Sequence, residues 1–116
     1  MPIGHWTFLS NHTHVLVCIA RNPDARVRDI ADRVGITERA IQRIIAELEE
    51  TGFLSHRRLG RRNRYTIHPD KTLRHELEAG VSIRGLLASI VSAEQLDHAT
   101  REALDADSEL ASRSAG

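Results

Sequence analysis

The stretch from Arg28 to Leu48, RDIADRVGITERAIQRIIAEL, constrains the fold of this chain more than any other part. Its first half places apolar residues at helical spacing, at Ile30, Ala31 and Val34. Gly35 follows, and glycine readily takes the left-handed backbone that ends many helices. Thr37 is a good N-cap for a second helix. The stretch therefore predicts two helices joined by a tight turn, a helix-turn-helix.

The second helix, expected over about residues 37–50, has two different faces. One face is apolar with helical periodicity, at Ile41, Ile44, Ile45 and Leu48. The other face carries polar side chains near the N-terminal end, namely Thr37, Glu38, Arg39, Gln42 and Arg43. Arginine and glutamine make bidentate hydrogen bonds to guanine and adenine in the major groove of DNA. We expect these five residues to contact DNA; the alternative is a solvated helix face with internal ion pairs.

An arginine-rich hairpin is predicted directly after this helix. Residues 53–59 and 64–67 have the composition of strands, and GRRN at 60–63 favours a turn. Candidate DNA contacts on the hairpin are Arg57, Arg58, Arg61, Arg62, Asn63 and Arg64. Such arginines would neutralise phosphates or enter the minor groove. The alternative is a charged sheet edge that prevents aggregation.

Apolar segments flank the motif on both sides. A first helix is expected over about 11–21, and its central run is apolar on most sides. After a short helix or turn at 71–80, an amphipathic stripe begins at Ile83, and a weaker helical pattern continues to about 105. We expect these segments to form a homodimer interface through Trp6, Phe8, Val15, Ile19, Ile83, Leu86, Leu87, Ile90 and Val91.

Charge is segregated along the chain, although 16 cations balance 16 anions overall. Residues 21–74 hold 13 Lys or Arg against 8 Asp or Glu, whereas residues 75–116 hold 3 against 8. This predicts a basic working surface and an acidic remainder.

Cysteine content and the absence of targeting signals favour the cytoplasm. The single cysteine, Cys18, allows no intramolecular disulfide. No apolar run is long enough for a membrane span, and no signal peptide is apparent. No sequence motif of an enzyme, a cofactor site or a metal site occurs, so we expect a non-enzymatic protein without cofactors.

The order of these parts resembles the winged-helix transcriptional regulators of bacteria and archaea, most closely the MarR-like group. The matching segments are IADRVGITERAIQRIIAELEETGFL and RRLGRRNRYTIHP. The resemblance implies a mainly α fold with a small β-hairpin and an added C-terminal helix for dimerisation. It also implies a dimer on pseudo-palindromic DNA, with the second helix in the major groove and the wing on the backbone.

The expected organisation is a winged helix-turn-helix over 1–70, a helical dimerisation segment over 71–105 and a disordered tail over 106–116. The expected function is sequence-specific regulation of transcription on double-stranded DNA, as a repressor. Two alternatives stay open. One is a winged helix that binds another protein, and the other is a regulator that responds to a small-molecule ligand or a metal.

Overall fold

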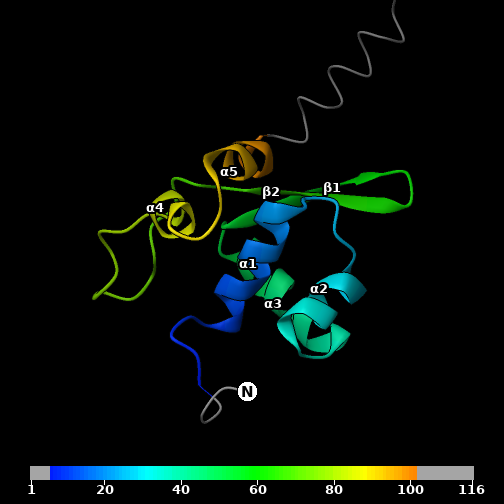
Figure 1. The fold of residues 1–116 in the computed structure, drawn as a ribbon, viewed down its shortest axis with the longest axis horizontal. Helices are drawn as coiled ribbons and strands as arrows, with labels where there is room; N and C mark the ends of the chain where they lie inside the picture. Colours follow the sequence, from blue (N-terminus) through cyan, green and yellow to red (C-terminus); the bar gives the residue numbers. More distant parts are fainter. Residues whose placement is uncertain (1–5, 102–116) are drawn as a thin grey trace, which may run out of the picture.

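The computed structural model describes residues 6–101 as five helices and one antiparallel hairpin (Figure 1). The elements are α1 (Asn11–Arg21), α2 (Val27–Val34), α3 (Glu38–Glu50), β1 (Leu54–Leu59), β2 (Arg62–Ile67), α4 (Ile83–Ala88) and α5 (Ala93–Thr100). This confirms the predicted fold class, mainly α with a small β-hairpin. The expected tail over 106–116 and the helical pattern beyond residue 101 lie outside the described residues.

Local signals set the helix boundaries as the sequence predicted. The Ser10 hydroxyl accepts a hydrogen bond from the Thr13 backbone N–H and starts α1. Gly35 ends α2 with φ 87°, in the left-handed region. The Thr37 hydroxyl accepts a hydrogen bond from the Ala40 N–H at 3.1 Å and starts α3. The helix-turn-helix is therefore specified by its own cap residues.

The end of α3 turns the chain directly into the hairpin. The Phe53 N–H donates to the Leu48 carbonyl at 2.9 Å, and the Gly52 N–H donates to the Glu49 carbonyl at 3.1 Å. This pair of bonds is a Schellman motif, and it needs the positive φ of 85° at Gly52. Only residues 51–53 separate the helix from the first strand.

The hairpin is longer and tighter than the sequence indicated. Six residue pairs run from Leu54↔Ile67 to Leu59↔Arg62, so the turn contains only Gly60 and Arg61. Gly60 has φ 63°, as the first position of a type II′ turn requires. The hairpin projects from the helical body in Figure 1.

Both faces of the hairpin's base are covered. Tyr65 and Ile67 are buried on the face expected from the sequence, while α3 contacts β1 and α1 contacts β2. Thr66 points to the opposite face, yet it is only 1% exposed because α5 packs against β2 there. The fold therefore places the short sheet between helices at its base and leaves its tip outside.

Burial corrects part of the expected dimer interface. α1 contacts α2, α3, α5 and β2 of its own chain. Five of the predicted interface side chains lie in this core with at most 6% exposure, at Val15, Ile19, Ile83, Leu87 and Val91. They offer no surface to a partner. Helix α5 of the same chain packs where a second subunit was expected from the sequence.

Residues 71–82 form a loop rather than the short helix allowed by the sequence. A bridge between Thr72 and Ser82 closes the loop, and Leu77 within it is 87% exposed. Ser82 caps α4 as expected, but α4 stops at Ala88, and a capping box at Ser92 starts α5. The longest helix described, α3 with 13 residues, is shorter than the roughly 20 residues of a membrane span.

Candidate nucleic-acid interface

The N-terminal half of α3 presents an unobstructed polar face. Ile41, Ile44 and Ile45 are at most 7% exposed and fix the opposite face to the core. Glu38, Arg39, Gln42 and Arg43 are all exposed. Among residues 6–101, Arg39, Gln42 and Arg43 have no side-chain hydrogen bond or ion pair with another residue. This face is therefore free to form hydrogen bonds with a ligand.

Acidic residues occupy the C-terminal half of α3, and two of them contact histidines. His12 Nε2 of α1 lies 3.0 Å from Glu47 Oε1, and His56 Nδ1 of β1 contacts Glu49 Oε2. The His56 ring also packs against Tyr65 at 5.8 Å between centroids. These contacts hold the Glu47 and Glu49 carboxylates against imidazole rings.

The hairpin tip gathers most of the predicted wing residues. Arg61 and Arg62 are exposed, Asn63 is half-buried, and Arg58 donates from Nε to the Gly60 carbonyl at 3.2 Å. A shallow groove between the tip and the start of α2 is lined by Arg58, Arg61, Arg62 and Asn63 together with Arg26. Arg26 was not among the residues predicted from the sequence to contact DNA. Its position immediately before α2 was the available signal, because helix starts attract phosphates.

Arg64 does not belong to this exposed cluster, which corrects its predicted role. Its side chain is only 13% exposed. One guanidinium nitrogen donates to Asp24 Oδ2 at 3.2 Å, and the other donates to the His98 carbonyl at 3.3 Å. Arg64 therefore joins β2 to the α1–α2 turn and to α5. The backbone reinforces this junction, since the Tyr65 N–H donates to the Pro23 carbonyl at 2.9 Å.

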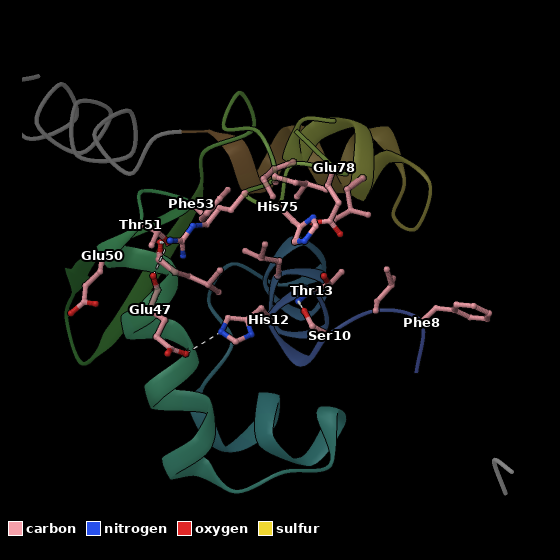
Figure 2. A pocket seen from close by; sticks show the side chains of 17 residues that line it. Phe8, Ser10, His12, Thr13, Glu47, Glu50, Thr51, Phe53, His75 and Glu78 are labelled. Atoms are coloured by element: carbon pink, nitrogen blue, oxygen red, sulfur yellow. Dashed lines mark hydrogen bonds and ion pairs between the residues drawn. The ribbon is translucent and has the colours of Figure 1, made fainter. Parts of the chain in front are cut away.

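A second feature is an open groove on the other side of α3 (Figure 2). Its floor is apolar and includes Leu16, Leu48, Phe53, Ile83 and Leu86. Its rim is charged and includes His12, Glu47, Glu50, Arg74, His75 and Glu78. The groove lies between α1, the end of α3, the 71–82 loop and α4.

Exposed apolar side chains lie near one end of this groove. Phe8 is 92% exposed and Trp6 is 67% exposed, and their rings meet edge to face at 5.0 Å. In Figure 2, Phe8 points away from the other labelled residues. Leu86 and Ile90, the other two members of the predicted interface, are half-buried. These four residues remain available to a partner.

Cys18 and the nearby histidines have ordinary surroundings. Burial raises the pKa of the Cys18 thiol above its usual value, against the opposing influence of Arg33 and Arg21. The thiol is therefore protonated and unreactive at neutral pH. His14 contacts the Asn11 side chain at 3.1 Å, and His12 is held by Glu47.

Comparisons with known proteins point to one family. The model of the MarR family matches residues 10–60, from the cap of α1 to the hairpin turn. No curated protein gives a significant match. Among solved structures, the chain is similar to the PcaV transcriptional regulator from Streptomyces coelicolor, crystallised with its natural ligand. That similarity has 23% sequence identity and a TM-score of 0.46, and it covers 90% of this chain and 74% of that one.

The family match covers the complete helix-turn-helix and the first strand of the wing. The match agrees, over these residues, with the resemblance stated from the sequence. Over residues 10–60 the chain is therefore similar to the MarR family, and its described elements have the order of a winged helix-turn-helix.

Proposed function

We propose that the protein is a homodimeric, sequence-specific repressor in the cytoplasm, and that α3 enters the major groove of double-stranded DNA. The observation that carries this proposal is the stripe of Arg39, Gln42 and Arg43. These side chains are exposed at helical spacing and have no other partner among the described residues. Arginine prefers guanine and glutamine prefers adenine, so each half-site would combine guanines with an adenine.

Contacts with the DNA backbone would come from residues around the wing. Arg26, Arg58, Arg61 and Arg62 line one groove, and their guanidinium groups could neutralise phosphates there. The Thr37 hydroxyl accepts the capping hydrogen bond but keeps its own proton, which can be donated to a phosphate. These contacts would fix the register of α3 without reading sequence.

A second copy of the chain would pack on the remaining exposed apolar residues. Trp6 and Phe8 carry the largest exposed rings, while Leu86 and Ile90 are half-buried on and just after α4. Aromatic side chains of this kind are enriched in protein interfaces. We expect Phe8→Ser to shift the protein from dimer to monomer in analytical ultracentrifugation, while Leu77→Ser, an exposed loop change, leaves the mass unchanged.

The test of DNA recognition begins with a duplex selected from a random pool by the intact protein. Arg43→Ala should weaken binding to this duplex by about 1–3 kcal/mol and should relax the preference at one base position. Arg61→Ala should weaken binding to the selected duplex and to random duplexes equally. It should also reduce the slope of log K against log salt concentration by about 0.9 for each phosphate that the side chain neutralises. Arg84→Ala on α4 is the control and should change neither quantity.

This experiment also separates the proposal from its main rival, a winged helix that binds only other proteins. A DNA-binding surface retains random duplex at low salt and releases it as salt rises. If the intact protein shows no such binding, the winged helix serves protein recognition and our assignment of the arginine face is wrong.

A ligand-responsive regulator is the second candidate, favoured by the groove in Figure 2. An apolar floor with a charged rim is the usual composition of a small-molecule site. Its wall includes Leu48 near the end of α3, so an occupant could reorient the reading helix. A ligand of this groove should raise the melting temperature of the intact chain and lose that effect in Leu73→Trp, which fills the groove.

A further inference from the structure

The reading helix α3 carries one exposed apolar side chain beside the polar residues already assigned to DNA. Ala46 follows Gln42 by four residues and Arg43 by three, so it lies one helical turn beyond them. The side chain of Ala46 is exposed. The polar stripe of α3 therefore continues into an exposed methyl group.

Ala46 lies close to the centre of the exposed face of α3. The direction of the core is given by the four buried side chains of this helix, Ile41, Ile44, Ile45 and Leu48. Each residue turns an α-helix by about 100°, so Arg39, Arg43 and Ala46 all lie within about 30° of the direction opposite to the core. A helix that enters the major groove with this face brings Ala46 toward the base edges together with the two arginines.

The length of this part of α3 suits the groove. The helix rises about 12 Å between Glu38 and Ala46, which is comparable with the width of the major groove, also about 12 Å. Beyond Ala46 the helix carries Glu47, Glu49 and Glu50, whose carboxylates phosphates repel. Ala46 is therefore the last residue on the exposed face of α3 that DNA does not repel.

The side chain of Ala46 can distinguish only one feature of a base pair. It offers no donor and no acceptor, so it cannot read the hydrogen-bonding pattern that arginine and glutamine read. Thymine alone among the DNA bases carries a C5 methyl group in the major groove, and an alanine methyl group contacts it through apolar packing. The chemistry at this position therefore selects thymine.

We propose that Ala46 is a specificity-determining residue of the DNA interface, and that its methyl group packs against the C5 methyl group of a thymine. The inference rests on the proposed function, because it needs α3 in the major groove. Side chains one helical turn apart have Cβ atoms about 5–6 Å apart, and successive base pairs are about 3.4 Å apart. The thymine should therefore lie within about two base pairs of the base that Arg43 reads.

The test replaces each thymine of the selected duplex in turn with deoxyuridine, which lacks the C5 methyl group and keeps the base pair. Loss of one buried methyl group corresponds to about a fourfold loss of affinity. The intact protein should show this loss at a thymine near the base read by Arg43. In Ala46→Gly, the ratio of the two dissociation constants, with deoxyuridine and with thymine at that position, should fall to about one.

This ratio separates a methyl contact from a change in helix stability. Glycine weakens a helix, but a weakened α3 lowers the affinity for both duplexes by the same factor and leaves their ratio unchanged. Ala40→Gly is the matched control, because it makes the same change in the same helix at a half-buried position. It should keep the ratio of the intact protein.

Three results would overturn the inference and leave the proposed function standing. The first is an intact protein that binds thymine and deoxyuridine duplexes equally at every position. The second is a ratio that Ala46→Gly leaves unchanged, and the third is a selected duplex without thymine near the base read by Arg43. If the intact protein binds no duplex even at low salt, the proposed function itself fails, and this inference fails with it.

Discussion

Replacing Arg64 with methionine should destabilise the fold and leave the charge contacts with DNA unchanged. The change removes an ion pair with Asp24 and a hydrogen bond to the His98 carbonyl but keeps most of the apolar stem. Asp24 is 47% exposed, so solvent screens the pair and its share is about 1 kcal/mol. The hydrogen bond from a charged donor adds about 1.5 kcal/mol. We therefore expect a loss of about 2–3 kcal/mol in the free energy of unfolding.

Urea unfolding at one fixed protein concentration measures this loss, because oligomerisation would shift the midpoint if concentration varied. Thermal unfolding should show a drop of roughly 8–24 °C in the melting temperature, since each kcal/mol corresponds to about 4–8 °C in a domain of this size. Arg62→Met is the matched control. Arg62 lies two residues away on the same face of β2 but is exposed, so its loss should cost less than about 0.5 kcal/mol.

In DNA binding we expect the reverse order, with a larger effect from Arg62→Met than from Arg64→Met. Under conditions where both variants are folded, Arg62→Met should reduce the salt slope by about 0.9 for each phosphate it neutralises, and Arg64→Met should leave the slope unchanged. Wild-type stability of Arg64→Met together with a shallower salt slope would refute our reassignment. Arg64 would then be a phosphate contact, as the sequence first indicated.

Further stability predictions follow from the backbone and the core. Gly60→Ala should lower the free energy of unfolding by about 1–2 kcal/mol, because the turn holds φ at 63°. Gly80→Ala is the control and should leave it unchanged in the same urea titration, because Gly80 has open space around it and no positive φ. Equal effects of the two changes would contradict the turn argument. Leu87→Ala should cost about 2–5 kcal/mol because the side chain is fully buried, while Leu77→Ala should change stability by less than about 0.5 kcal/mol. Thr37→Ala should lose about 1 kcal/mol through the α3 cap, and an unchanged midpoint would show that the cap is dispensable.

Features set by neighbours in the sequence were predictable. The bounds of α1, the left-handed Gly35 and the caps at Thr37 and Ser82 each depend on residues within one turn of a helix. The alternation that buries Tyr65 and Ile67 was equally visible, because a strand repeats every two residues.

Features set by distant segments were not predictable from one sequence. Periodicity showed that Leu87 and Val91 had to be covered, but it could not show that their own chain covers them. Arg64 looked like its neighbours in the wing, since nothing local indicates a partner 40 residues earlier at Asp24 or a carbonyl at His98. A burial pattern identifies a face, and only the tertiary structure identifies its partner.

The three-residue passage from α3 to β1 has a consequence for how such a regulator adapts. The hydrogen bonds of the Schellman motif fix the backbone between Thr51 and Phe53. They therefore fix the orientation of the arginine hairpin relative to α3. Under the proposed function, this joint sets the separation between the base contacts of α3 and the phosphate contacts of the hairpin. Substitutions on α3 can therefore change which bases are read, whereas a different spacing between base and phosphate contacts would require rebuilding this joint.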